Sequence, residues 1–228
     1  MDMTNWKWLN ESQIIRDDNE VVIYAPGHTD WFNNPIPVDG KLSAPVANAP
    51  FFYTEVKGDF VFRAKVRPNF KYTYDACALM VIKDEQVWCK AAFEKSDFGT
   101  TAAVCVVTNG VSDDANGCNI AQDEVWLQIV RVGDVFCTHY SLDGVKFDMV
   151  RLFHLPVEET VMVGIEAQSP AGEGGMRFYS DITLEQRTEE NLRALAEAGL
   201  DGACVYQVNM DAATGDILMI SPDEQGNG

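Results

Sequence analysis

The stretch Phe60-Val61-Phe62-Arg63-Ala64-Lys65-Val66-Arg67 alternates between two kinds of side chain. Its first, third, fifth and seventh residues are apolar, and three of the other four are basic. Successive side chains of a strand point to opposite faces of a sheet. A period of two with this polarity therefore predicts a strand with one face against a core and the other face in water.

The same period continues through most of the chain. Ten further stretches have the pattern of strands: residues 20–25, 51–56, 76–83, 87–94, 101–108, 125–132, 135–141, 146–152, 161–167 and 176–185. Gly133-Asp134 and Asp143-Gly144 stand at hairpin spacing, and both residue types tolerate the positive φ of tight turns. Short strands with almost no helix between them predict an all-β fold, an antiparallel two-sheet jelly-roll β-sandwich.

The pattern changes after the last of these strands, so we expect a jelly-roll domain at residues 1–185 and an extension at residues 186–228. Thr188 and the two acidic residues after it predict the start of a helix, because a hydroxyl caps the first turn and acids favour the positive end of the helix dipole. Gly199 is a suitable end for that helix.

The rest of the extension has the pattern of a hairpin. Residues 203–210 and 216–220 resemble two strands, and residues 221–228 have the composition of a disordered end. A two-stranded hairpin is marginal alone. We therefore expect the extension to dock on the sandwich or on a second copy of the chain, which would make a homodimer.

Charge narrows the class of partner. The 228 residues include 35 Asp and Glu against 17 Lys and Arg, for a formal net charge of −18. Residues 186–228 have eight acidic and two basic residues, which leaves −12 for residues 1–185. Such a field repels phosphate backbones and anionic lipid, so neither nucleic acid nor a membrane surface is an expected partner.

The cysteines and the N-terminus bear on compartment. The six cysteines are scattered singly, with no C-x-x-C pair. We interpret them as reduced thiols, most of them packed in the core. The first residues lack the basic and apolar regions of a secretory signal, and no apolar run approaches the length that spans a bilayer. The expected location is cytoplasmic.

Searches for common catalytic and cofactor motifs find none. The chain has no phosphate-binding glycine loop, no G-x-S-x-G and no H-E-x-x-H. Cys137 and His139 share a strand face, but no second pair is spaced to complete a zinc site. Asp17 to Asn19 and Asp113 to Asn116 form oxygen-rich loops of the kind that calcium prefers, although turns require the same residues. No cofactor or metal is predicted.

The strand at residues 87–94 offers the clearest candidate binding face. Trp88, Lys90 and Glu94 share one face of it, with Ala92 between the last two. An aromatic plane beside a cation and a carboxylate suits a polyhydroxylated ligand, since the ring stacks on the sugar and the charges bond its hydroxyls. The alternative is a solvated face whose charges pair with neighbouring strands and whose Trp covers the edge of the sandwich.

Other residues are candidates for the same cleft. Asp30 and Trp31 lie in a polar loop with a second aromatic, which suits either the rim of a pocket or a plug for the end of the sandwich. Tyr74 and Asp75 precede another strand. Arg63 lies on a basic strand face, and if that face converges with Lys90, a small anionic sugar becomes an expected ligand.

An ordered set of segments adds a resemblance. These segments are Thr29-Asp30-Trp31-Phe32, Gly58-Asp59-Phe60-Val61-Phe62, Tyr74-Asp75-Ala76-Cys77-Ala78-Leu79-Met80, Trp88-Cys89-Lys90-Ala91-Ala92-Phe93-Glu94, Val106-Val107-Thr108-Asn109-Gly110, Arg131-Val132-Gly133-Asp134, Tyr140-Ser141-Leu142-Asp143-Gly144 and Val163-Gly164-Ile165-Glu166-Ala167-Gln168-Ser169-Pro170. In this order, residues 6–185 resemble the domain-of-unknown-function family that includes the fungal regulation-of-enolase proteins.

The resemblance implies a concanavalin A-like lectin/glucanase sandwich with a concave face and a carbohydrate-binding role, and it implies no defined reaction. Family members often have Trp-x-Lys-x-x-x-Glu where Trp88, Lys90 and Glu94 stand. They also often have Ser-Asp-Trp-Ser where this chain has Ser112-Asp113-Asp114-Ala115, so the loop tryptophan is missing here.

Three functions remain open from the sequence. The first is a non-catalytic protein that binds a carbohydrate or small polyol. The second is a carbohydrate-active hydrolase whose carboxylates come from different strands, because no Glu begins the E-x-D-x-x-E motif of jelly-roll glucanases. The third is a regulatory or scaffolding protein that acts through protein contacts.

Overall fold

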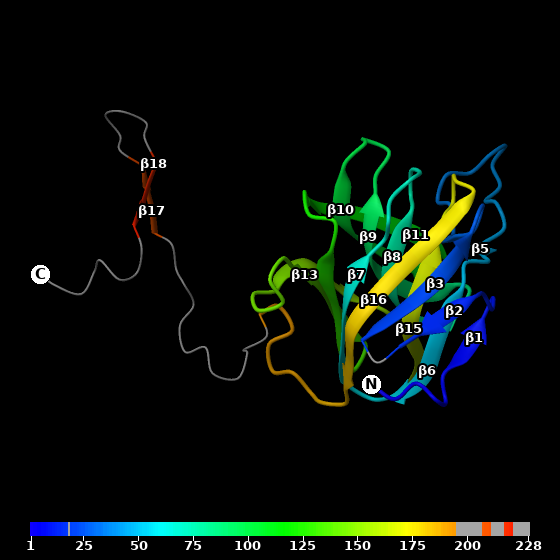
Figure 1. Cartoon of the computed structure of the whole chain (residues 1–228), viewed down its shortest axis with the longest axis horizontal. Helices are drawn as coiled ribbons and strands as arrows, with labels where there is room; N and C mark the ends of the chain where they lie inside the picture. The colour runs from blue at the N-terminus through cyan, green and yellow to red at the C-terminus, as the bar shows by residue number, and fades with distance from the viewer. Residues whose placement is uncertain (18, 195–206, 211–216, 221–228) are drawn as a thin grey trace, which may run out of the picture. The chain divides into compact units, whose positions relative to one another are not determined.

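The computed structural model describes residues 1–17, 19–194, 207–210 and 217–220 (Figure 1). The chain forms two compact units, Met1–Leu195 and Ala196–Gly228. In the second unit, β17 (Gln207–Met210) pairs antiparallel with β18 (Ile217–Ile220), in agreement with the predicted hairpin. Residues 188–194 contain bends and turns but no helix, and the rest of the helix predicted from Thr188 lies outside the described residues.

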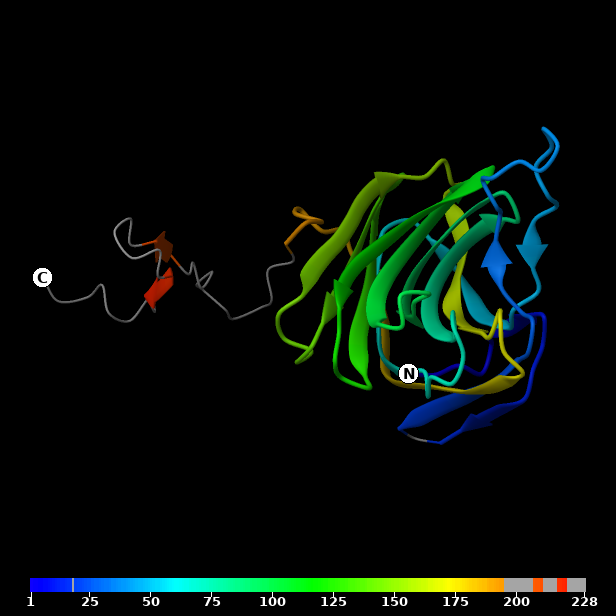
Figure 2. The same cartoon turned by 90° about the horizontal axis from the view of Figure 1, so that it is seen from above.

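The first unit is a sandwich of two antiparallel sheets, which confirms the predicted fold class. Sheet A has the strand order β1 (Lys7–Leu9), β6 (Phe51–Lys57), β15 (Thr160–Gln168), β8 (Ala76–Asp84), β9 (Val87–Lys95), β10 (Thr101–Asn109), β11 (Val111–Asn119). Sheet B has the order β14 (Asp148–His154), β13 (Val135–Ser141), β12 (Val125–Val132), β7 (Phe60–Arg67), β16 (Gly174–Glu185), β3 (Glu20–Pro26), β2 (Ile14–Arg16). Figure 2 shows the curved strands of the two layers from above.

The main core lies between the two sheets. The apolar face of β7 contributes Phe60 and Phe62 to it, as the alternation predicts. Leu79 and Phe93 enter the same core from sheet A. The inner faces of both sheets are therefore mainly apolar, and the buried ion pair between Asp75 and Arg177 is an exception at one end of the sandwich.

The outer face of sheet A is also buried, because a second layer of chain covers it. Residues 29–50, which we call the covering segment, include β4 (Trp31–Phe32), paired with β5 (Val46–Ala47). Asn33 fastens the segment to the sheet: its backbone N–H donates to Ser112 Oγ at 2.9 Å, and its carbonyl accepts from the Ser112 N–H at 2.8 Å. A second apolar cluster forms beneath the segment, around Trp31 and Trp88.

Of two local features predicted from the sequence, a turn is confirmed and a loop is wrong. Gly133, at φ +59°, turns β12 into β13 as predicted. The oxygen-rich loop expected at Asp113 to Asn116 is wrong, because these residues belong to strand β11 at the edge of sheet A. An edge strand pairs with only one neighbouring strand, and many of its side chains are exposed. Its sequence therefore lacks the alternation of apolar and polar residues that identifies a central strand.

Candidate functional site

A cavity of about 200 Å³ opens on the outer face of sheet A, beside the covering segment. We call it the Lys90 cavity. Its lining side chains are Asp30, Phe32, Tyr74, Lys90, Glu94, Val106, Asp114 and Gln168. The lining therefore combines three carboxyl groups, one ammonium, one amide and two aromatic rings.

Lys90 is the only cation among these lining residues, and it is 2% exposed. Its ammonium donates to Asp30 Oδ1 at 3.1 Å, to the Trp31 carbonyl at 2.9 Å and to Gln168 Oε1 at 2.7 Å. An ammonium has three N–H groups, so all of them have protein acceptors. Lys90 thus joins β9 to the covering segment and to β15.

The amide of Gln168 continues this network toward Glu94. Its Nε2 donates to the Tyr74 carbonyl at 3.0 Å and to Glu94 Oε2 at 3.3 Å. The amide oxygen is already bonded to Lys90, which fixes the orientation of the amide group. Side chains from β9 and β15 therefore hold one another across the intervening strand β8.

Burial controls ionisation in this network. Burial raises the pKa of Glu94 to about 8, and the nearby Lys90 ammonium opposes that rise only in part. Burial lowers the pKa of Lys90, but the carboxyl groups of Asp30, Glu166 and Glu94 raise it by more, so the net shift is upward. Near neutral pH the network therefore favours a charged Lys90 and a protonated Glu94.

A second buried carboxyl group, Glu166 on β15, lies next to the network. It is fully buried, and neither of its oxygens has a hydrogen-bond partner among the described residues. Burial raises its pKa to about 8 as well, with Lys90 opposing. A neutral Glu166 avoids the desolvation cost of an unpaired buried charge.

The rim of the cavity is aromatic on two sides. Phe32 lies on β4, and Tyr74 precedes β8 with a φ of +66°, in the left-handed region that tyrosine rarely adopts. The Tyr74 N–H donates to the Lys95 carbonyl at 2.7 Å, and its own carbonyl accepts from Gln168. Neighbouring hydrogen bonds therefore hold this backbone in place at the cavity, as strained residues at functional sites often are.

Asp75, predicted as a ligand contact, is fully buried and does not line the cavity. It forms a 2.7 Å ion pair with Arg177 on β16, which is also fully buried. Asp75 Oδ1 also accepts from the Ser169 hydroxyl, and Oδ2 accepts from the N–H groups of Lys71 and Tyr72. Asp75 therefore fixes the loop before Tyr74 and links the two sheets at this end of the sandwich.

The two tryptophans predicted as ligand contacts are also buried. Trp88 is 0% exposed because Trp31 packs edge-on against it, with ring centroids 6.2 Å apart. The Trp31 indole donates to the Ala49 carbonyl at 3.0 Å. Neither ring faces the cavity, so the expectation that Trp88 offers an open stacking plane is wrong. Its ring lies instead beneath the Lys90 ammonium, 5.7 Å from it.

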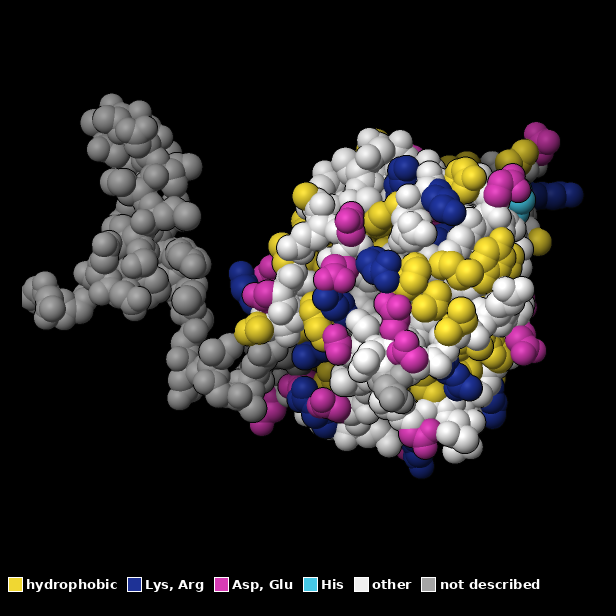
Figure 3. Space-filling view, in the orientation of Figure 1, with side chains coloured by type: hydrophobic (Ala, Val, Ile, Leu, Met, Phe, Trp, Pro, Cys, Tyr) yellow, Lys and Arg dark blue, Asp and Glu magenta, His cyan; other side chains and the backbone are white. Residues whose placement is uncertain are grey.

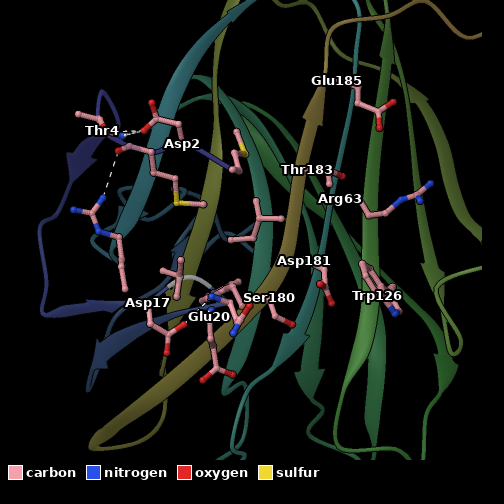
Figure 4. Close-up of a pocket in the computed structure, with 17 residues that line it drawn as sticks. Asp2, Thr4, Asp17, Glu20, Arg63, Trp126, Ser180, Asp181, Thr183 and Glu185 are labelled. Atoms are coloured by element: carbon pink, nitrogen blue, oxygen red, sulfur yellow. Dashed lines mark hydrogen bonds between the residues drawn. The ribbon is translucent and has the colours of Figure 1, made fainter.

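Arg63 lies on the outer face of the other sheet, so the expected convergence of its strand face with Lys90 is wrong. It donates two hydrogen bonds to Gln128 Oε1, at 3.0 and 2.6 Å, and its guanidinium lies over the Phe147 ring at 4.1 Å. It lines a different groove of about 730 Å³. Figure 4 shows that the side chains of this groove, among them Asp2, Asp181 and Trp126, spread along the sheet rather than converge on one point.

Among the described residues, the face shown in Figure 3 and the cysteines present no second cluster of side chains with defined chemistry. On the face that holds β16 and β3, acidic and basic side chains are interspersed around a strip of hydrophobic ones (Figure 3). In the part of the chain that the structure describes, no group of three or more His, Cys, Asp or Glu side chains is arranged to hold a metal ion. Cys137 and His139 contact each other at 3.5 Å inside the protein, without further ligands there.

The structure thus brings together four predicted ligand contacts, Asp30, Tyr74, Lys90 and Glu94, with Phe32, the second aromatic of the polar loop. Val106, Asp114 and Gln168 also line the cavity and are not among the predicted ligand contacts. Gln168 is one of these, and its position two residues after Glu166 in a strand of alternating polarity is a signal that was available. Asp114 is another, and it was assigned to a loop. No helix in the described residues is long and apolar enough to cross a membrane.

Comparisons with known proteins identify a family and a relative in yeast. The family model described as "Protein of unknown function (DUF1349)" matches residues 8–187. "Regulation of enolase protein 1" of Saccharomyces cerevisiae is 26% identical over 187 residues, which are 80% of this chain and 90% of that protein.

Two solved structures share the sandwich. A functionally unknown protein from Saccharomyces cerevisiae matches with a TM-score of 0.75 and 24% identity, over 82% of this chain and 100% of that one. A legume lectin-like domain from Entamoeba histolytica matches with a TM-score of 0.52 and 12% identity, over 81% and 91% of the two chains. At these identities the likeness is one of fold, and the fold is lectin-like.

Proposed function

The chain belongs to the DUF1349 family of proteins of unknown function, and from that premise we propose that it is a non-catalytic protein that binds a carbohydrate or small polyol in the Lys90 cavity. The observation that supports the proposal is the composition of this cavity. Fixed polar groups form its interior and two aromatic rings stand at its rim, which is the combination that sugar recognition uses.

The volume of the cavity limits the ligand. A cavity of about 150 Å³ accommodates a molecule the size of benzene, and drug-sized ligands occupy roughly 300 Å³ or more. At about 200 Å³, the Lys90 cavity suits one sugar ring or a smaller polyol. A longer oligosaccharide would place one unit inside and the others outside.

Calorimetry with a panel of monosaccharides and small polyols tests the proposal. We expect saturable binding by at least one of them at millimolar concentration, and at least a tenfold loss with Glu94→Gln, which keeps the size of the side chain. Lys65→Met on the outer face of sheet B serves as the control and should bind like the wild type. No binding by any member of the panel, or equal binding by Glu94→Gln, would overturn the proposal.

A second candidate is a carbohydrate-active hydrolase, because Asp30, Glu94 and Asp114 reach one cavity from different elements. A buried carboxyl group with a raised pKa is a suitable general acid, and a second carboxylate across the bond completes such a site. Release of the aryl group from aryl glycosides by the wild type, abolished in Glu94→Gln, would favour this candidate over simple binding.

A third candidate is regulation through protein contacts, which the name of the yeast relative suggests. The hairpin of the second unit is the element we would test first. Light scattering of the full chain and of a chain ending at residue 186 compares their masses. A lower oligomeric state in the shorter chain would support a role for the extension in self-association, and equal states would count against it.

A further inference from the structure

Every side-chain N–H group that lines the Lys90 cavity already has a protein acceptor. The three N–H groups of Lys90 are bonded to Asp30, Trp31 and Gln168. The two N–H groups of Gln168 are bonded to Tyr74 and Glu94. Apart from these N–H groups, the lining side chains include the Tyr74 hydroxyl, which lies near Asp97. An anionic group entering the cavity would find no unused side-chain N–H on its lining.

Acceptors, in contrast, remain available. Asp30 Oδ2 has no protein donor among the described residues, although Oδ1 accepts from Lys90 and from the Trp31 N–H. Glu94 Oε1 has no protein partner among them either, and it accepts a hydrogen bond once Glu94 is ionised. Glu94 is 8% exposed and lines the cavity, so a ligand is its main opportunity for a further hydrogen bond. Asp114 adds a third carboxyl group from β11.

The charged groups that line the cavity also favour a cationic ligand. Three carboxyl groups line the cavity against a single ammonium, and that ammonium is already paired with Asp30. Burial raises the pKa of Asp114, and the Asp30 carboxyl group adds to the rise, while the Lys90 ammonium opposes it only in part. The aromatic rings at the rim also attract cations through their faces.

We propose that the Lys90 cavity selects a cationic polyol, of the amino-sugar class, over neutral and anionic sugars. This inference rests on the function proposed above and specifies its ligand. The ammonium of the ligand lies among Asp30, Glu94 and Asp114, where its positive charge favours loss of the Glu94 proton to solvent. The hydroxyl groups of the ligand donate to the carboxylate oxygens that the protein leaves unpaired. The net charge of −18 raises the local concentration of such cations in the same direction.

The experiment compares three ligands of one ring size, D-glucosamine, D-glucose and D-glucuronate, by calorimetry with the full chain at physiological salt. We expect glucosamine to bind at least tenfold more tightly than glucose, and glucuronate to bind more weakly than both. A tenfold difference corresponds to about 1.4 kcal/mol, which is modest for one charge pair at a part-buried site.

Two matched variants test the assignment of the charge. Asp114→Asn removes a carboxylate from the cavity, and Asp113→Asn removes one from the opposite face of the same strand, where it pairs with Arg151. We expect Asp114→Asn to reduce the preference for glucosamine over glucose by fivefold or more, and Asp113→Asn to leave it unchanged.

The outcomes separate the two proposals. Glucose binding as tightly as glucosamine, or the same preference in wild type and Asp114→Asn, overturns the selection for a cation and leaves carbohydrate binding in place. Tightest binding by glucuronate overturns the selection in the same way. No binding by any of the three sugars overturns the proposed function and this inference together.

Discussion

The ammonium of Lys90 on β9 donates a 2.7 Å hydrogen bond to the side-chain oxygen of Gln168 on β15, across the intervening strand β8. Lys90 also bonds to Asp30 and to the Trp31 carbonyl of the covering segment. One buried cation therefore fixes both the interior of the cavity and the segment beside it. If the cavity binds the ligand that we propose, stability and binding are coupled through this residue.

Lys90→Met is expected to lower the free energy of unfolding by about 3–5 kcal/mol, because it leaves Asp30 and Gln168 without their shared donor. It should also expose Trp31 and Trp88 to water, since the covering segment loses an attachment. Urea unfolding followed by tryptophan fluorescence measures both effects.

The control for this variant is Lys65→Met on the outer face of sheet B. Lys65 pairs with Glu124 at the surface, where an ion pair contributes roughly 1 kcal/mol or less. Equal losses in the two variants, or an unchanged fluorescence maximum in Lys90→Met, would contradict the role assigned to Lys90.

Stability should fall as pH rises from about 5 to 8. Burial raises the pKa of Glu166 from its ordinary value of 4.5 to about 8, despite the opposing Lys90. Between these two values the native state keeps a proton that the unfolded chain has lost. This stabilisation is complete below the lower value and disappears as pH passes the upper one.

Glu94 also has a pKa raised to about 8, so two carboxyl groups hold protons in the native state that the unfolded chain has lost. Glu166→Gln removes one of these two groups, and Glu94 still contributes the other. The slope of the unfolding free energy with pH should therefore become shallower by about 1.4 kcal/mol per pH unit within this window. Urea unfolding at half-unit steps measures the slope. Identical slopes in wild type and Glu166→Gln would show that Glu166 ionises normally in the folded protein.

The inner faces of the strands were predictable because they follow a strict period of two. Phe60 and Phe62 on β7, and Phe93 on β9, point into the core as expected. The same alternation placed Lys90 and Glu94 together on the other face of β9, and both line the cavity. The period of two therefore identifies, from the sequence alone, which side chains of one strand lie on the same face.

The period of two in the sequence does not show which strands pair with each other. It also does not show where segments without a regular pattern run. Arg63 has the polarity of a ligand contact, but β7 belongs to sheet B, and the order of strands in a sheet depends on long-range pairing. Trp88 is buried because residues 29–50, which have no regular pattern, cover it. Gln168 and Asp114 reach the cavity through pairings of β15 and β11 that no local signal specifies.

Removing either partner of the buried pair Asp75–Arg177 should destabilise the fold strongly. Arg177→Met leaves Asp75 as an unpaired buried charge, at an expected cost of about 3–5 kcal/mol. Asp75→Asn leaves Arg177 unpaired at a similar cost. The double variant should be less destabilised than the two single losses added together, because neither charge then remains. Additive losses in urea unfolding would mean that the two residues act independently.

Tyr74 allows binding to be separated from stability. Its φ of +66° lies in the left-handed region, where asparagine is accommodated with less strain. In Tyr74→Asn, relief of that strain offsets the lost ring contacts, so the free energy of unfolding should stay within about 1 kcal/mol of the wild type. The variant nevertheless removes an aromatic ring from the rim of the cavity.

Affinity for the sugar ligand should therefore fall about tenfold in Tyr74→Asn, since stacking on an aromatic ring contributes on the order of 1 kcal/mol or more. Tyr72→Asn is the matched control, because Tyr72 is similarly exposed, lies two residues away and does not line the cavity. Calorimetry and urea unfolding of both variants give the two quantities side by side. If Tyr72→Asn weakens binding as much as Tyr74→Asn does, the effect comes from the loop as a whole, and the rim of the cavity would have to be reassigned.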